Sequence, residues 1–330
     1  MSSSEFDTAS KDNTHLLRRQ AARIMASALV GALAILQAEP VKEAPRTIVR
    51  VPVSVVLQDD SPALKPSDFS ARVGNEEAKV VRVRSPKSDL LLLVVFDVSG
   101  DLALVGPAKQ SLVDRLKELS SKTYIALLRA QNGLQVLRDP SNKREDLAEA
   151  IQSVAVSGKA GMLDTVETAC RLADSIAARS GVRAAVLYVT DSDVRNYRED
   201  FTNPVINSSD LRDLSRRFPE GLVREKISKL EDTLTGLQSP LFFVHLDYRT
   251  DRLNEAYQTG LMQLATATGG AGIFCRSQGE IPDAIRHAMS SVSSQYVVSV
   301  ELPGKASRLV SVQLESGDRA VAYRSRFRFR

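Results

Sequence analysis

The chain has 330 residues, of which 43% are hydrophobic and 25% are charged, and this composition is typical of a folded globular protein and not of a fibrous or disordered one. The formal net charge is only +4, aromatic residues make up 5% and tryptophan is absent. The small net charge does not call for a nucleic-acid partner and the few aromatic residues argue against a platform for stacking bases, so we expect no nucleic-acid partner.

Residues 1–38 have the pattern of a secretory signal peptide. Basic residues precede an apolar run over 24–36, and cleavage would follow Ala38. The apolar run is short for a membrane span. We expect export to the periplasm, the outer envelope or the cell exterior, with no stable membrane span after cleavage; an uncleaved signal anchor is the alternative. Residues 39–46 read as a linker.

Residues 47–86 have the pattern of a small β unit. Valines alternate with other residues over 49–55, and a turn of acidic residues, serine and proline follows. Two further strand patterns, over 69–73 and 78–83, flank a Gly-Asn turn.

An apolar run over 90–96 ends in Asp97, Ser99 and Asp101. The run predicts a strand buried on both faces of a parallel sheet, and open α/β sheets bind ligands at the carboxyl ends of such strands. Aspartate and serine oxygens suit Mg²⁺ or Mn²⁺. The alternative is that Asp97 and Ser99 only cap the next helix and hold no ion.

Strand and helix patterns alternate over 87–295, which predicts an α/β fold with a doubly wound sheet. A turn at 131–133 predicts that the strand after it pairs antiparallel with the preceding strand, at the edge of the sheet. The expected strands cover 90–96, 124–129, 134–137, 184–190, 241–246 and 272–275. One expected helix has Pro107 in its first turn and runs to Ser121, and the others cover 143–154, 161–178, 222–237, 253–268 and 281–293.

The spacing of Asp97, Ser99 and Asp101 resembles the Asp-x-Ser-x-Ser signature of von Willebrand factor type A domains, which have a Rossmann-like sheet and a metal-ion-dependent adhesion site. Asp101 stands at the second serine of the signature, and Ala160 stands where the family has a threonine ligand. Asp191 matches the last family ligand. The resemblance implies a degenerate site in which Asp97, Ser99, Asp101 and Asp191 hold Mg²⁺ or Mn²⁺, or in which no ion binds.

The order of features over 47–330 resembles an exported, VWFA-related bacterial family first described in Acidobacteria. Leu64, Asp68 and Phe69 carry an element that precedes the type A domain there, and strands over 296–330 end in alternating arginines. The resemblance implies that these last strands pack with the 47–86 unit as an accessory β-sandwich.

The stretch 193–221 has no clear period and follows Asp191, so it should overhang the same sheet edge. It contains arginine and aromatic residues, which are enriched in interface cores. We predict partner contacts for Arg195, Tyr197, Arg198 and Phe201; a loose insertion is the alternative.

The sequence contains no common catalytic motif, and Ser99 has no histidine in register to activate it. We therefore predict an exported, non-catalytic module for adhesion or assembly, which binds a protein through the carboxyl-end face of the sheet and needs no organic cofactor. The alternatives are a metal-free scaffold with a vestigial site and, more distantly, a metal-dependent hydrolase. Cys170 and Cys275 are expected to be two separate buried thiols.

Overall fold

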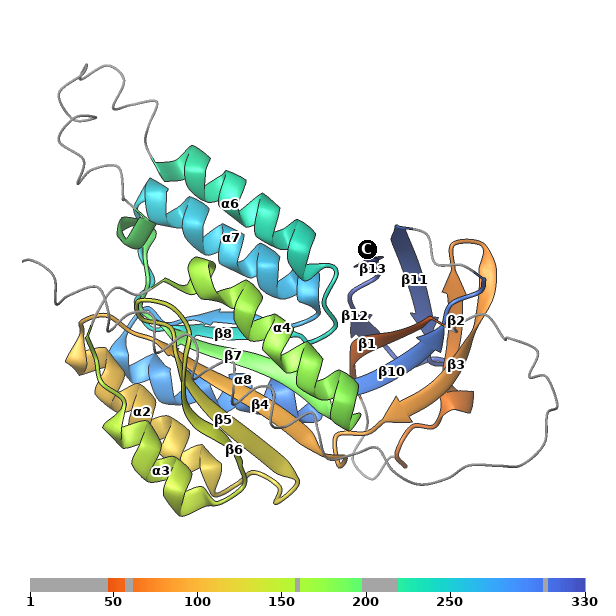
Figure 1. The fold of residues 1–330 in the computed structure, drawn as a ribbon, viewed down its shortest axis with the longest axis horizontal. Helices are drawn as coiled ribbons and strands as arrows, with labels where there is room; N and C mark the ends of the chain where they lie inside the picture. The colour runs from red at the N-terminus through yellow and green to blue at the C-terminus, as the bar shows by residue number, and fades with distance from the viewer. Residues whose placement is uncertain (1–46, 57–61, 158–160, 198–218, 305–307, 330) are drawn as a thin grey trace, which may run out of the picture. The chain divides into compact units, whose positions relative to one another are not determined.

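A computed structural model describes residues 47–329 except 57–61, 158–160, 198–218 and 305–307 (Figure 1). The predicted signal peptide (1–38) and the predicted linker (39–46) lie outside the described residues. Within the described ranges, no helix is both long enough and apolar enough to cross a bilayer.

The central sheet has the order β6-β5-β4-β7-β8-β9. Five of its strands run parallel, and β6 is antiparallel to β5 at the edge, as the turn at 131–133 predicts. The strands are β4 (Leu90–Asp97), β5 (Thr123–Arg129), β6 (Gln135–Ser141), β7 (Arg183–Thr190), β8 (Leu241–His245) and β9 (Gly272–Phe274).

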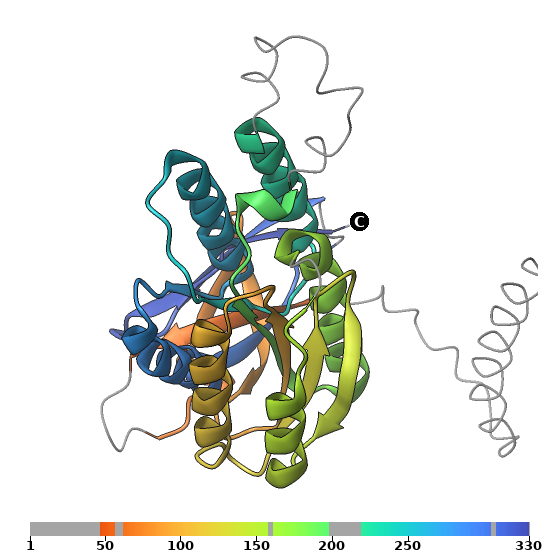
Figure 2. The same cartoon turned by 90° about the vertical axis from the view of Figure 1, so that its left-hand side faces the viewer.

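Helices cover both faces of this sheet (Figures 1 and 2). Every residue of β4 is buried, and alternate side chains enter different cores because successive residues of a strand face opposite ways. Leu91 and Leu93 pack in one core, whereas Leu92 and Val94 pack in the other. The first core is closed by α4 (Met162–Ser180), α6 (Pro219–Leu234) and α7 (Arg252–Thr268), and the second by α2 (Leu102–Leu116), α3 (Arg144–Ser153) and α8 (Ile281–Ser294). The chain is thus an α/β protein with a doubly wound, Rossmann-like sheet.

The bounds predicted for the helix after β4 were wrong. It begins at Leu102, five residues before Pro107, and ends at Leu116. The Asp101 carboxylate accepts a hydrogen bond from the backbone N–H of Ala103 and so caps the first turn. Pro107 lies inside the helix, where it removes the hydrogen bond that its own N–H would have made and crowds the carbonyl one turn earlier. The cap and the packing of the helix on the sheet outweigh that loss.

A second sheet joins strands from both ends of the described chain, in the order β12-β1-β10-β3-β2-β11-β13 (Figure 1). Its valines face a core of their own, with Val49, Val51 and Val298 fully buried. The strands are β1 (Ile48–Val55), β2 (Ser70–Val73), β3 (Glu76–Arg84), β10 (Tyr296–Glu301), β11 (Leu309–Glu315), β12 (Val321–Tyr323) and β13 (Arg326–Arg328).

Arg183 joins the two sheets, which belong to one compact unit. Its side chain is 3% exposed at the start of β7. The guanidinium donates to the carbonyls of Pro86 (2.7 Å) and Ser88 (3.2 Å) before β4, and to that of Gln295 (2.8 Å) before β10. Burial lowers the pKa of Arg183 to about 10. One buried cation therefore satisfies carbonyls at both crossings between the sheets.

Candidate functional site

Two of the predicted site residues meet at the carboxyl ends of neighbouring strands. Asp97 is the last residue of β4 and lies opposite Thr190, the last residue of β7. Asp191 follows directly, and its backbone N–H donates to the Asp97 carbonyl at 3.2 Å. The parallel pairing of β4 with β7 therefore brings Asp97 and Asp191 together, although 93 residues separate Asp97 from Thr190.

The Asp191 carboxylate closes the loop that follows β4. Its oxygens accept the backbone N–H of Ser99 at 2.8 and 3.0 Å, the Ser99 hydroxyl at 3.2 Å and the backbone N–H of Gly100 at 3.3 Å. Hydrogen bonds to an ionised acceptor are stronger than bonds between neutral groups. Asp191 therefore holds Ser99 and Gly100 against the end of β7.

Asp97 is fully buried, at 0% exposure. One carboxylate oxygen accepts the backbone N–H of Gly161 at 2.7 Å, and the other accepts the Thr190 hydroxyl at 2.7 Å. Burial raises the pKa of Asp97 to about 6, because desolvation of the charge outweighs these hydrogen bonds. The nearby Asp191 adds a smaller repulsion in the same direction.

A buried chain of hydroxyl groups ends on Asp97. The Thr190 hydroxyl donates a hydrogen bond to Asp97. The Ser192 hydroxyl lies 2.7 Å from that of Thr190, and the Tyr257 hydroxyl lies 2.7 Å from that of Ser192. His245 donates from Nε2 to the Ser192 carbonyl at 2.7 Å, since a carbonyl can only accept. Burial lowers the pKa of His245.

The sequence analysis missed most of this network. Thr190 and Ser192 flank Asp191 at a strand end, and this polar run was a local signal that could have marked them. Tyr257 carries no such signal, because it comes from α7 and reaches Ser192 across 65 residues.

Asp101 does not join Asp97 and Asp191. It is the N-cap of α2, it is exposed, and its carboxylate accepts the Ala103 N–H at 2.9 Å. Among the described residues, no group of three or more His, Cys, Asp or Glu side chains is placed to hold a metal ion.

The arrangement of these side chains differs from the four-residue metal centre that the resemblance implies. Both oxygens of Asp97 and both of Asp191 already accept hydrogen bonds from protein groups. Three of the four residues matched to the family signature therefore satisfy one another or the backbone, and Asp101 is used as a cap. Ala160, at the family's threonine position, lies outside the described residues. Hydrogen bonds from protein groups thus offset part of the cost of placing these two carboxylates side by side.

The predicted partner-binding segment starts beside this site. Arg195 and Tyr197 belong to the short 3-10 helix η2 (Val194–Tyr197). This helix is anchored to α7, since the Val194 N–H donates to the Asn254 side chain at 3.0 Å. Asp193 pairs with Arg249 at 3.1 Å. Arg198 and Phe201 lie outside the described residues.

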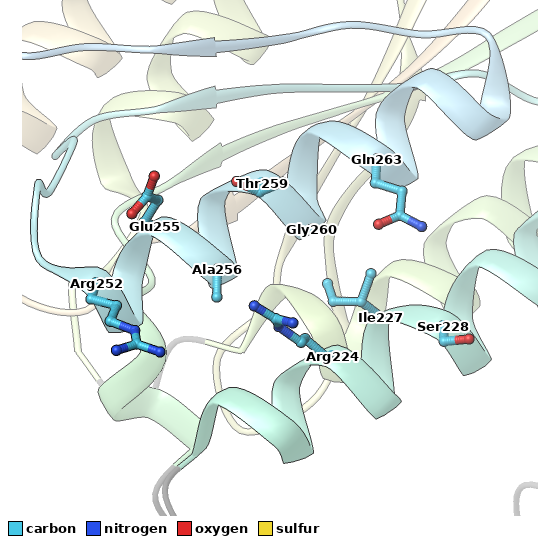
Figure 3. A pocket seen from close by; sticks show the side chains of 9 residues that line it. All are labelled: Arg224, Ile227, Ser228, Arg252, Glu255, Ala256, Thr259, Gly260 and Gln263. Atoms are coloured by element: carbon cyan, nitrogen blue, oxygen red, sulfur yellow. The ribbon is translucent and has the colours of Figure 1, made fainter.

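A separate groove of about 510 Å³ lies between α6 and α7. Figure 3 shows Arg224 from α6 and Arg252 and Glu255 from α7 around this hollow. The helices approach closely on its floor, where a Cβ on Gly260 would lie 2.7 Å from Ile227 Cδ1. Glycine at position 260 is thus a packing requirement of the α6–α7 pair.

The chain matches no protein-family model and no curated protein sequence. Similar solved structures include a von Willebrand factor type A protein from Catenulispora acidiphila, at 11% identity over 82% of this chain and 74% of that chain, with a TM-score of 0.44. The SpRpn10 VWA domain is another similar structure, at 10% identity over 61% of this chain and 95% of its own, with a TM-score of 0.38. BatB from Bacteroides thetaiotaomicron is 14% identical over 62% of this chain and 99% of its own, with a TM-score of 0.38. The PilB minor pilin from Streptococcus sanguinis is 11% identical over 63% and 62%, with a TM-score of 0.43. At these identities the likeness concerns the fold alone.

Proposed function

We propose that this chain is an exported, non-catalytic module that binds a protein partner through the carboxyl-end face of its central sheet, and that it does so without a divalent cation. The observation that carries the proposal is the closure of the Asp191 carboxylate on Ser99 and Gly100. It presents a fixed polar surface at the edge where open α/β sheets bind their ligands, next to the start of the predicted partner-binding segment.

The described residues of this face support binding rather than catalysis. The Ser99 hydroxyl is hydrogen-bonded to Asp191, and no histidine is its partner. His245 is 1% exposed, its Nε2 is engaged with the Ser192 carbonyl, and its Nδ1 accepts the Asp247 N–H at 3.4 Å. A serine nucleophile needs a base within hydrogen-bond reach, and this pair does not supply one.

The hydrogen bonds of the two carboxylates and the capping role of Asp101 support the metal-free form of the proposal. Protein donors already contact every oxygen of Asp97 and Asp191, and the Asp101 carboxylate accepts the Ala103 N–H instead of facing them. The resemblance to the family signature supports the competing form, in which Mg²⁺ or Mn²⁺ is held by Asp97, Ser99, Asp101 and Asp191.

A thermal melt of the full chain in EDTA and in millimolar Mg²⁺ or Mn²⁺ separates the two forms, because an ion that binds only the folded state raises the melting temperature by mass action. We expect no rise for the wild type. The variant Ala160→Thr restores the hydroxyl of the family signature, so its melting temperature is the one in which ion binding is easiest to detect. A rise in the wild type that Asp97→Ala abolishes would replace the metal-free form by the cation-dependent one.

Partner binding is tested by capture from envelope extract on the immobilised chain, with and without EDTA. We expect the immobilised chain to capture a partner in the presence and in the absence of EDTA. The double variant Arg195→Glu, Tyr197→Ala should fail to capture it. The matched control is Arg72→Glu, an exposed position on the second sheet. If the double variant captures the partner and the Arg72→Glu control does not, the contact lies on the second sheet, as in the scaffold alternative.

A further inference from the structure

The outer face of the second sheet carries a row of arginines around one serine. Arg50 on β1 is the register partner of Ser299 on β10, and Ser299 is the register partner of Arg82 on β3. Arg84 lies two residues further along β3 and therefore on the same face. Three guanidinium groups and one hydroxyl thus converge from three adjacent strands.

These residues line a groove of about 520 Å³ between the sheet and the end of α4. Gly181 and Gln238 line its other side, and no acidic residue is among the lining residues. A Cβ on Gly181 would lie 3.0 Å from a terminal guanidinium nitrogen of Arg84. Glu301 lies two residues beyond Ser299 on the same face of β10 and does not line the groove.

The positive charge in this groove is not neutralised within the described part of the chain. No carboxylate there forms an ion pair with Arg50, Arg82 or Arg84; Arg50 Nε instead donates to the neutral Gln238 side chain at 2.8 Å. Burial lowers the pKa of Arg84, and repulsion from Arg82 and Arg50 lowers it further. The Ser299 hydroxyl is 4% exposed and has no hydrogen-bond partner among the described residues.

Two structural roles do not account for the cluster. Charged residues often protect the edge of a sheet from aggregation, but β1, β10 and β3 are interior strands of this sheet. A cation at a helix carboxyl end is favourable, and Arg84 lies over the end of α4 beside Gly181. That role uses one guanidinium, and Arg50 uses only its Nε on Gln238, so neither role accounts for Arg82 or for the gathering of the three groups.

We propose that this groove is a binding site for a phosphate-type oxyanion, held by Arg50, Arg82 and Arg84 with the Ser299 hydroxyl as a further donor. Guanidinium groups donate in pairs to the oxygens of phosphate. Three of them suit a dianionic phosphate or phosphate monoester better than a single carboxylate. The site lies on the accessory sheet and is independent of the proposed contact face at the carboxyl ends of β4 and β7.

The test is isothermal titration of the full chain with inorganic phosphate, with glycerol 3-phosphate as the monoester and with acetate as the carboxylate, all at ionic strength matched with chloride. We expect phosphate or its monoester to bind and acetate to bind at least about tenfold more weakly. Stronger binding of glycerol 3-phosphate than of phosphate identifies an esterified ligand, and the reverse order identifies the free ion. Acetate binding equal to phosphate binding would overturn the proposed ligand class.

Arg82→Ala is the main variant, because Arg82 is exposed and forms no ion pair with a described residue, so its removal should leave the fold intact. Removing one charged donor should weaken phosphate binding by about tenfold or more. Arg82→Lys keeps the charge but loses the paired donors and should recover only part of the affinity. The matched control is Arg72→Ala on β2, outside the groove.

A melting curve in low salt provides a second readout. Without phosphate, Arg82→Ala should melt at or above the wild-type temperature, because it relieves repulsion. With phosphate, the wild type should rise and the variant should not. Equal shifts for phosphate and chloride, or equal loss of binding in Arg72→Ala and Arg82→Ala, would show only non-specific screening and overturn the site.

Discussion

Asp191 accepts both the backbone N–H and the hydroxyl of Ser99, at 2.8 and 3.2 Å, and so ties the loop after β4 to the end of β7. This relationship predicts a structural cost for Asp191→Ala that does not depend on metal. The variant removes the acceptor of the half-buried Ser99 and exposed Gly100 N–H groups, which water can partly replace, so we expect a cost of about 1 to 2 kcal/mol of unfolding free energy. Urea unfolding in EDTA measures the loss.

Asp101→Ala is the matched control, since it removes a carboxylate that only caps α2 and should cost about 1 kcal/mol. Equal losses for the two variants would show that Asp191 contributes no more than a helix cap does.

Asp97 predicts a pH dependence of stability. Burial raises its pKa in the folded protein to about 6, above its ordinary value of 3.8. The folded state therefore holds the proton more tightly than the unfolded state, and this stabilisation is complete below pH 3.8 and lost as the pH rises through 6. The difference corresponds to about 3 kcal/mol at neutral pH.

Asp97→Asn removes this ionisation and should be more stable than the wild type at pH 7, with the advantage shrinking toward pH 4. Burial lowers the pKa of His245 and so gives a trend of opposite sign, but that trend is common to both proteins and cancels in their difference. Chemical denaturation of both proteins at several pH values measures this difference in unfolding free energy. A difference that does not change between pH 4 and 7 would contradict the prediction.

Arg183 is predicted to be among the most sensitive polar positions. Arg183→Met leaves the carbonyls of Pro86, Ser88 and Gln295 without their donor, and we expect a loss of about 3 kcal/mol or more of unfolding free energy. Arg183→Lys should recover little, because one ammonium group cannot reproduce the guanidinium fork. Arg179→Met, at an exposed position, is the control and should change stability by less than about 0.5 kcal/mol. A loss in Arg183→Met no larger than the control's would contradict this assignment.

The prediction of two separate buried thiols is confirmed. Cys170 and Cys275 are free, and they lie in the cores on opposite faces of the sheet. Burial raises the pKa of Cys170 far above its ordinary value and that of Cys275 to about 11. A thiol reagent should find no fast-reacting cysteine in the native protein and two after unfolding without a reductant. Fewer than two would indicate a disulfide.

Gly260 is predicted to set the spacing of α6 and α7. A methyl group at position 260 would meet Ile227 at 2.7 Å, so Gly260→Ala should cost about 1 to 3 kcal/mol of stability through overpacking. Ile227→Ala removes the obstructing atoms, and the double variant should be more stable than the sum of the two single losses implies. Simple additivity in this double-mutant cycle would refute the packing explanation.

The alternation of strands and helices can be predicted from the sequence, because a buried run such as 90–96 and an amphipathic period such as that of α4 report burial over a few residues. The antiparallel edge can be predicted as well, since the turn before β6 needs Asn132 and Gly133 at positive φ. These patterns are local, and the structure follows them closely.

Which polar residues meet could not be predicted from the sequence, because it depends on how distant segments pack. Asp101 follows the family spacing but caps α2, whereas Tyr257 carries no motif and reaches the network of Asp97 through Ser192. The row of Arg50, Ser299 and Arg82 exists because β10 pairs with both β1 and β3. Residue type and spacing along the chain do not encode such register between distant strands. The register follows from burying all the apolar faces at once, and the polar side chains take the positions that this packing leaves to them.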